Sequence, residues 1–358
     1  MALRHPLLSN IFTQIFFWIF AFGFYFTLLF FTAKAITSLF ALNVTIHNSG
    51  NMFVGFITAI AFGIILGIID YYIDRKFRRK SFGIEFLVKF ILYTIAWFSV
   101  TIFARTIGFA LQAQFIQNPL LNYSNEFFEN IGLSSTIYTV VMIVIISFVK
   151  QMNTKFGPGV LLPMFFGKYR DPRVEERIFM FMDLTNSTSH AEKLGHIKYS
   201  ELIQNCFLDA NRIMQNYFAE IYQYVGDEIV LSWTADEGFK NYNCIEYFFA
   251  FKNYLQTKKK KYEEQFGLVP EFKAALHFGK ITVVEVGDIK REIAYHGDTI
   301  NIASRIQTLC KTYNQNLLIS ESLTDVVSKS DKHKLTFIDD VLLKGKTEKV
   351  KLYTVEKI

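Results

Sequence analysis

The chain has 358 residues, a formal net charge of +6 and 51% hydrophobic residues, which are unevenly distributed. Residues 1–150 hold ten Lys/Arg and five Asp/Glu, whereas the other 208 residues hold 28 and 27, so the density of charge rises from 10% to 26%. The first part is too apolar for a water-soluble domain, and the second has an ordinary globular composition. A purely cytosolic protein is excluded, and the pattern predicts a membrane domain at 1–150, a linker elbow at 151–176 and a globular domain at 177–358.

Four uncharged apolar stretches in the first part are each near the roughly 20 residues that a helix needs to cross a bilayer. They cover 11–32, 52–69, 90–104 and 131–149, and we predict that each forms a membrane-spanning helix. The third is the weakest candidate because Lys89 and Arg105 bracket it. Both side chains could snorkel to opposite interfaces, and the alternative for Arg105 is a sensing or interhelical role.

The charges of the connections predict the orientation of these helices. The first connection carries only Lys34, and the third carries only Glu126 and Glu129, whereas the second is crowded with basic residues: Arg75, Lys76, Arg78, Arg79 and Lys80. The second connection is therefore expected in the cytosol, together with both termini and everything after Lys150. The basic excess is thus a topology signal, and no nucleic-acid partner is expected. A cleavable signal ending at the A-x-A-like residues 33–35 is the competing interpretation, but the first apolar stretch is too long for an ordinary signal.

Glycines and prolines predict the elbow, and the spacing of the cysteines argues against a disulfide framework or a zinc site in the globular part. Helix-breaking residues follow the fourth stretch at Gly157, Pro158, Gly159, Pro163 and Pro172. The cysteines lack the paired spacing of a disulfide framework or a zinc site, so they are expected to be reduced and buried: Cys206, Cys244 and Cys310.

Strand and helix patterns alternate through the globular part. The apolar run RIFMFMDL predicts a strand, 189–217 a helix, and EIYQYV and EIVLSW a hairpin closed by a Gly-Asp turn. A second helix is expected near 236–266, then strands FKAALHFG and KITVVEVG, a helix over 299–312, and short strands LLIS, KLTFID and VKLYTV. The expected fold is an α+β sandwich with a largely antiparallel sheet.

Two carboxylates stand out by position in this pattern. Asp183 ends a strand and precedes a helix start whose backbone amides could face an anion, although Asp183 or Asn186 could simply cap that helix. Asp227 lies in the tight turn of YVGDE, where aspartate is common for conformational reasons. If the two strands are neighbours, the pair could share two divalent cations, as in sites for in-line phosphoryl chemistry.

Two further segments complete the pattern. In HGDTINIASRIQ, Asn301 and Arg305 are four residues apart and share one helical face, after a turn and helix entry at Gly297 and Asp298. In LLKGKTEKVKLYTV, lysines 344 and 346 flank a glycine between two strands, which on its own indicates a solvated basic hairpin.

FMDLTNST, YVGDE, GDTINIASR and LKGK occur in the order and approximate spacing of the class III nucleotidyl cyclases, and the resemblance covers 177–355. It implies a ferredoxin-like palm and the conversion of a nucleoside triphosphate, with ATP first, to a 3′,5′-cyclic nucleotide and pyrophosphate. It also implies a homodimer with composite sites, each with two Mg²⁺ or Mn²⁺ ions. One chain would give the aspartates to a site, and the other the asparagine, arginine and lysine.

The residues that match the family's functional positions carry its roles by resemblance. Asp183, Asp227 and the Leu184 carbonyl match the metal ligands, and Thr188 matches a phosphate contact. Asn301 would orient the ribose, Arg305 would stabilise the transition state, and Lys344 would hold the terminal phosphates.

Base recognition is where this sequence departs from the family pattern. Gln223 stands where adenylate cyclases often have a lysine, and Ala294 where an aspartate or threonine is common, with Tyr295 beside it as a possible stacking partner. A glutamine both donates and accepts hydrogen bonds, so guanine or a pyrimidine remains an alternative to adenine. A catalytically silent receptor or interaction module is the alternative from another class. YVGDE differs from the GGDEF-like turn of diguanylate cyclases.

Overall fold

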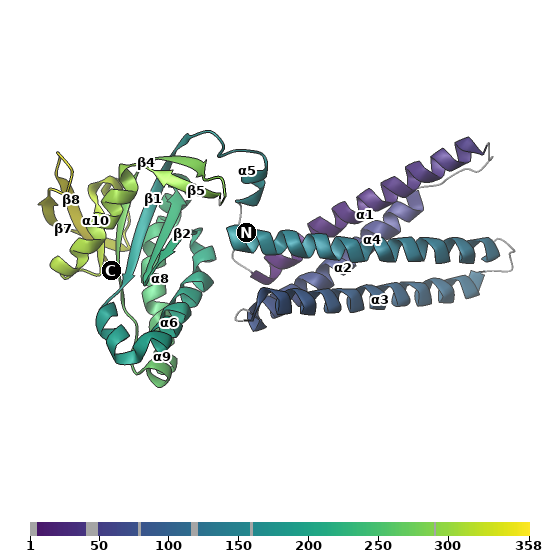
Figure 1. The fold of residues 1–358 in the computed structure, drawn as a ribbon, viewed down its shortest axis with the longest axis horizontal. Helices are drawn as coiled ribbons and strands as arrows, with labels where there is room; N and C mark the ends of the chain where they lie inside the picture. Colours follow the sequence, from purple (N-terminus) through teal and green to yellow (C-terminus); the bar gives the residue numbers. More distant parts are fainter. Residues whose placement is uncertain (1–5, 41–48, 78–79, 116–120, 158–159, 290) are drawn as a thin grey trace. The chain divides into compact units, whose positions relative to one another are not determined.

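The computed structural model describes residues 6–40, 49–77, 80–115, 121–157, 160–289 and 291–358 (Figure 1). The chain forms two compact units, Met1–Phe156 and Gly157–Ile358. The first is built of long apolar helices, and the second combines a mixed sheet with helices, which confirms the predicted fold class.

Four helices make up the first unit: α1 (Pro6–Leu39), α2 (Ser49–Lys76), α3 (Phe82–Phe115) and α4 (Leu121–Phe156). Each contains a stretch long and apolar enough to cross a membrane: Leu7–Leu39, Phe56–Lys76, Phe82–Phe103 and Leu133–Lys155. The four predicted spans are therefore found as four helices. The side chain of Arg105, and residues 78 and 79 of the basic connection, lie outside the described residues.

Helices α1 and α2 approach each other backbone to backbone. A Cβ atom added at Gly63 would lie 2.7 Å from the Cα of Ile15, and one added at Gly67 would lie 2.5 Å from the Cα of Ile11. Two glycines four residues apart are the small-residue pattern that lets helices pack closely in lipid, where dispersion contacts replace the hydrophobic effect.

A buried carboxylate links all four helices. Asp70 of α2 is fully buried and accepts hydrogen bonds from Gln14 of α1 (2.6 Å), from the Tyr93 hydroxyl of α3 and from the Lys150 ammonium of α4. Lys89 of α3 extends the network to the carboxylate of Asp74 at 2.6 Å. Removing one partner of a buried ion pair costs typically about 3–5 kcal/mol, so this network fixes the arrangement of the bundle.

The second unit is built on one sheet with the order β2-β3-β1-β4-β6-β8-β7, and β5 pairs with β4. Every pairing is antiparallel except that of β4 with β6. The strands are β1 (Arg173–Leu184), β2 (Glu220–Val225), β3 (Glu228–Thr234), β4 (Phe272–Val286), β5 (Glu292–His296), β6 (Leu317–Ser320), β7 (His333–Val341) and β8 (Val350–Lys357).

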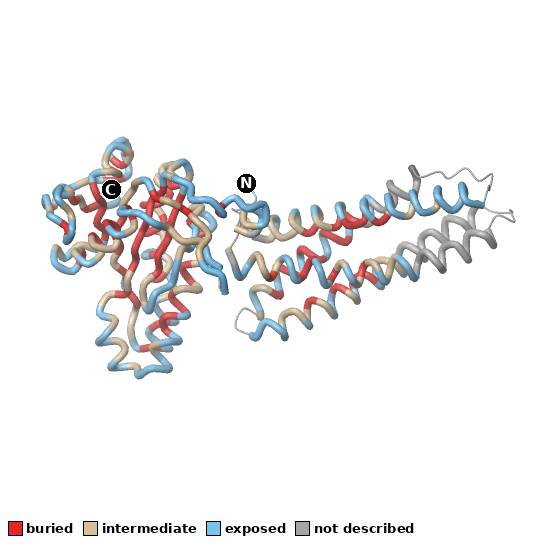
Figure 2. Tube along the Cα trace, turned by 45° about the horizontal axis from the view of Figure 1, so that its top comes forward, coloured by how far each residue is buried: buried red, intermediate tan, exposed pale blue. Residues whose placement is uncertain are grey.

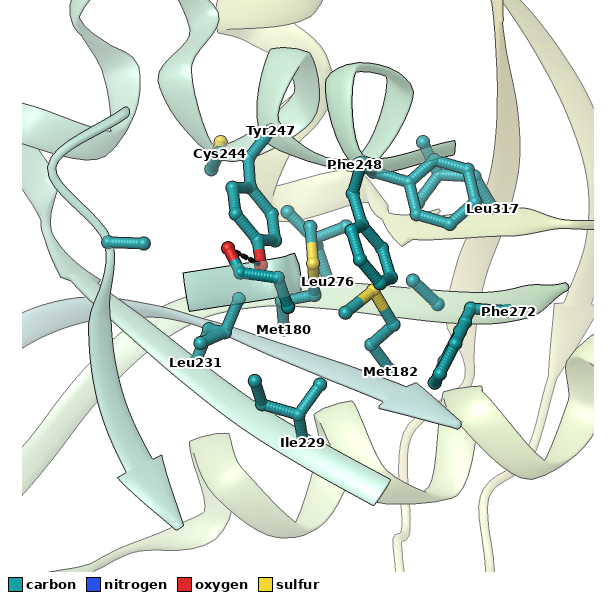
Figure 3. Packing of buried hydrophobic residues seen from close by; sticks show 14 of the residues in the cluster. Met180, Met182, Ile229, Leu231, Cys244, Tyr247, Phe248, Phe272, Leu276 and Leu317 are labelled. Carbon is teal, nitrogen blue, oxygen red and sulfur yellow. Dashed lines mark hydrogen bonds between the residues drawn. The ribbon is translucent and has the colours of Figure 1, made fainter. Parts of the chain in front are cut away.

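Helices cover both faces of this sheet. Alternate residues of β1 point to opposite sides, so apolar side chains on both faces are buried by helices. Met180 and Met182 belong to the main core with α6 (Ser187–Met214), α8 (Asn243–Thr257) and α9 (Lys259–Phe266) (Figure 3). Phe179 and Phe181 pack on the other face, with Ala303 of α10 (Asp298–Thr312). The central strands are accordingly buried (Figure 2).

Two expectations about the elements are wrong. The segments FKAALHFG and KITVVEVG form the single strand β4, because Gly279 between them pairs with Arg177 in an uninterrupted ladder with β1. The helix expected near 236–266 is divided into α7 (Ala235–Phe239), α8 and α9: Asn241 and Tyr242 adopt left-handed φ values of 52° and 58° between α7 and α8, and Lys258 has a non-helical conformation between α8 and α9.

Candidate active site

The two predicted metal aspartates lie at the same end of neighbouring strands. Asp183 is the last residue but one of β1, and it pairs across the ladder with Glu228, the first residue of β3. Asp227 immediately precedes Glu228 in the turn between β2 and β3, where Gly226 has a φ of +61° that favours glycine. The hairpin turn and the strand pairing therefore bring both aspartates to one edge of the sheet.

Burial and neighbouring carboxylates raise the pKa values of Asp183 and Glu228 at this edge. Burial, followed by the nearby charge of Asp227, raises the pKa of Asp183 to about 6. Burial and the charges of Asp183 and Asp227 raise the pKa of Glu228 to about 7. Desolvation and like charges both disfavour the ionised carboxylates, and a cation bound nearby would offset that cost.

The chemistry of Asp183 and Asp227 suits a divalent cation. The Oδ2 atom of Asp227 is buried and has no hydrogen-bond partner, which makes it available as a ligand. Among the described residues no three His, Cys, Asp or Glu side chains form a ready metal centre. Mg²⁺ is usually held by one or two carboxylates together with substrate phosphates, so a pair of aspartates fits it.

The start of α6 follows directly on β1, the strand that carries Asp183. Leu184 ends β1 and is buried, whereas Thr188 is exposed in the first turn of α6. Asn186 occupies the N-cap position with a φ of 57°, but its side chain makes no capping hydrogen bond. The reading of this segment as a simple side-chain cap is therefore not supported, and amides of the first turn remain without a side-chain acceptor.

A groove of about 530 Å³ adjoins this edge. It runs between α6 and the β2–β3 hairpin, and its apolar walls include Ile203, Phe207 and Tyr224, with Gly226 at the end nearest Asp227. Tyr224 closes one wall by stacking on Phe207, with ring centroids 4.7 Å apart, and by donating a 2.9 Å hydrogen bond to Asn211. The volume lies within the range of small-molecule sites.

The second predicted set of residues gathers at α10 and the β7–β8 turn. Asn301 is exposed in the second turn of α10, and Arg305 is partly buried one helical turn later. A Cβ atom added at Gly345 would lie 3.8 Å from both terminal nitrogens of Arg305, so the LKGK turn that carries exposed Lys344 lies against this guanidinium. The helix is seated on β4 by Thr299, whose hydroxyl donates to the Lys280 carbonyl at 2.6 Å.

Helix α10 presents its two functional faces in different directions. A hydrogen bond from Gln307 of α10 acts to lower the pKa of Asp183, which places Gln307 beside that carboxylate. Arg305 is two residues from Gln307. At 100° per residue, the two side chains leave the helix roughly 160° apart, and so on nearly opposite faces. The structure thus joins Asp183 to Asp227 and Arg305 to the Lys344 turn, but it does not turn Arg305 toward the aspartates of its own chain.

The residues expected near the base are not brought together in the same way. Exposed Gln223 pairs with Val230, which faces the α10 side of the sheet, whereas Ala294 lies on the opposite side of β5 from Tyr295. The Tyr295 ring is enclosed by Tyr222 (4.8 Å between centroids) and by the guanidinium of Arg177 at 5.1 Å. Tyr295 therefore serves as a packing residue here, and not as an open platform for a base.

The sequence patterns did not single out Glu228 or Gln307. Glu228 follows the hairpin-tip aspartate directly, but its neighbour Asp183 comes from the separate pairing of β3 with β1, which the hairpin pattern does not specify. Gln307 lies 124 positions from Asp183 in the chain, and no local pattern relates the two.

Comparisons with known proteins identify the family of the second unit. Residues 170–357 match the profile of the adenylate and guanylate cyclase catalytic domain. The chain is 35% identical over 192 residues to adenylate cyclase 2 of Rhizobium meliloti (strain 1021), which covers 54% of this chain and 53% of that protein. It is 26% identical over 187 residues to an adenylate cyclase of Anabaena cylindrica, which covers 49% and 36%.

The matched region is about half or less of the length of each of these relatives. The fold is similar to that of a bacterial light-regulated adenylyl cyclase, with a TM-score of 0.50 and 16% identity over 68% of this chain and 66% of that one. Since the family match covers the whole β1 to β8 unit, the chain belongs to the class III adenylate and guanylate cyclases.

Proposed function

We propose that this chain is a membrane-anchored adenylate cyclase that converts ATP to 3′,5′-cyclic AMP and pyrophosphate at two composite sites of a homodimer. The observation that carries the proposal is the division of the site residues. Asp183 and Asp227 meet at one edge, whereas Arg305 and the Lys344 turn face away from them. A second copy related by two-fold symmetry supplies what each half lacks.

In such a site, each residue has a chemical task that suits its type. Asp183 and Asp227 would hold two divalent cations, Mg²⁺ or Mn²⁺, which when bound favour ionisation of the ribose 3′-hydroxyl and offset charge on the phosphates. The 3′-oxygen forms a bond to the α-phosphorus as the bond to the pyrophosphate oxygen breaks and the hydroxyl proton leaves. Arg305 from the partner places positive charge at the attacked phosphate, Asn301 orients the ribose, and Lys344 holds the leaving pyrophosphate.

Adenine is the proposed base because the curated relatives that match this chain are adenylate cyclases. Gln223 faces the side of the sheet that carries α10 and is exposed, and its amide can both donate to and accept from an adenine edge. The Leu184 carbonyl would complete the metal ligands, and Thr188 would contact phosphate at the start of α6.

Product analysis tests the substrate and the metal-binding pair together. Purified full-length protein given equimolar ATP, GTP, CTP and UTP with Mg²⁺ or Mn²⁺ should yield cyclic AMP and pyrophosphate, identified by mass spectrometry. Asp183→Asn and Asp227→Asn should each lower turnover by roughly a hundredfold or more, because each change replaces a charged metal ligand with a neutral side chain of the same size. Asp325→Asn, an exposed change on α11 (Thr324–Val327), is the control. Near-normal turnover in both aspartate variants at saturating metal would contradict the assignment, and a different cyclic product would reassign the base.

Complementation between two inactive variants tests the composite site. Asp227→Asn and Arg305→Ala should each be inactive, because every site in either homodimer lacks one group. Co-expression should restore about one quarter of wild-type activity, since half of randomly paired dimers are mixed and one of their two sites is intact. Isolated mixed dimers with no more activity than the single variants would show that both residues serve one site from one chain.

The pH dependence of metal binding follows from the raised carboxylate pKa values. Without metal, stability should fall as pH rises from about 4 to 7, because Asp183 and Glu228 are ionised in the unfolded chain over that range, whereas in the folded state they ionise only near 6 and 7. Stabilisation by Mn²⁺ should increase over the same window, since the metal binds the ionised form. Thermal exposure of the three buried cysteines to a thiol reagent reports on this unit alone: Cys206, Cys244 and Cys310. A Mn²⁺ effect that is equal at both ends of the window, or undiminished in Asp183→Asn, would count against a metal at this edge.

Membrane topology has its own test. We propose from the basic residues of the second connection that it lies in the cytosol, with both termini and the cyclase domain on the same side. Single cysteines at Ser38 and Ser124 should therefore react with an impermeant thiol reagent in intact cells, whereas one at Ser81 should react only after permeabilisation. The unchanged chain, whose cysteines are buried, gives the background. Labelling at Ser81 alone would invert the orientation.

A further inference from the structure

The turn between β7 and β8 has a defined conformation. The Lys346 amide donates to the Leu343 carbonyl at 3.0 Å, and Gly345 has a φ of +76°. A hydrogen bond across four residues with a left-handed glycine in the third position is the pattern of a type II turn. Lys344 is the second residue of that turn and is exposed. The position of its ammonium group thus depends on what holds the turn.

Helix α10 holds the turn at both ends. Leu343 is 4% exposed and belongs to the apolar cluster that includes Ile302 and Ile306 of α10. At the other end, the Lys346 ammonium forms an ion pair with the carboxylate of Asp298, the first residue of α10. The guanidinium of Arg305 lies between these two attachments, beside Gly345.

The ion pair has more influence on geometry and charge than on stability. The side chains of Lys346 and Asp298 are 27% and 51% exposed, and a pair at that exposure adds little to the free energy of unfolding. Its position is what matters, because Asp298 begins the helix that carries Arg305, close to where an anionic triphosphate would meet Lys344. An unpaired carboxylate there would repel the phosphates.

We propose that Asp298 and Lys346 are positioning residues, which fix the Lys344 turn against Arg305 and neutralise a carboxylate that would otherwise oppose the substrate. The inference rests on the proposed cyclase function. It gives Lys346 a task different from that of Lys344, although the two lysines are separated only by Gly345. It also predicts that losing Lys346 is worse than losing Asp298, because only the first change leaves a bare carboxylate.

The experiment measures kcat and KM of the full-length protein for its nucleotide. Lys346→Met should lower kcat on the order of tenfold, as expected when a catalytic group is mispositioned, and Asp298→Asn should lower it less. The double variant should resemble Asp298→Asn, so that the two effects are not additive. The exchanged pair Asp298→Lys with Lys346→Asp should recover part of the loss. Lys349→Met, an exposed lysine of the same connection, is the matched control and should leave both constants unchanged.

Binding of inorganic triphosphate, measured by calorimetry on the same proteins, provides a readout that needs no turnover. Lys346→Met should bind it several-fold more weakly than the wild type, and the double variant should regain part of that affinity. Equal kcat, KM and triphosphate affinity in Lys346→Met and the wild type would overturn the positioning role, as would additive effects in the double variant. A wild-type protein that turns over no nucleotide would contradict the proposed function, while the triphosphate measurement would still decide the role of the pair.

Discussion

The burial of carboxylates at the end of β1, together with the repulsion between them, is the constraint on which the catalytic unit depends. Asp183 and Asp227 are brought together by the β1–β3 ladder and the β2–β3 turn, both of which are stabilised by a buried core and not by the carboxylates themselves. The raised pKa values of Asp183 and Glu228 record the cost of that placement. Folding energy from the core thus maintains a carboxylate cluster whose ionised form is disfavoured, and a bound cation would offset that cost.

Helix α10 divides the remaining chemistry between two directions. One buried face packs on β4 and β6 through residues such as Ile306, while Gln307 turns toward Asp183. A third face carries Asn301 and Arg305 with the LKGK turn beside it. Helix α10 therefore contacts Asp183 of its own chain through Gln307 and carries Asn301 and Arg305 on another face. In a two-fold dimer this arrangement would link the two sites through one element, because a shift of α10 changes both.

The parts of the fold that local patterns specify could be predicted from the sequence, and those that depend on distant partners could not. The β2–β3 hairpin and α10 follow from a Gly-Asp turn and from helical periodicity, and both are found. Gly279 resembles a turn residue, but its small size instead lets Thr299 approach, with an added Cβ only 2.7 Å from the hydroxyl oxygen. Strand β5 is short, pairs with β4 and packs through Ile293 and Tyr295 on residues far away in the sequence, such as Phe179. The Lys346–Asp298 pair joins residues 48 positions apart.

The buried network in the helical unit shows the same limit, and it bears on the proposed dimer. A search for uncharged stretches ends the second span just before Asp70, so the residue that joins all four helices looks like a boundary. Lys150, its partner on α4, lies six residues before that helix ends at Phe156. The proposed composite sites require two cyclase units to meet, and anchoring both in one membrane would raise their effective concentration, provided that the linkers can span the distance. The proposed dimer would therefore depend on the Asp70 network to keep the four helices in one arrangement.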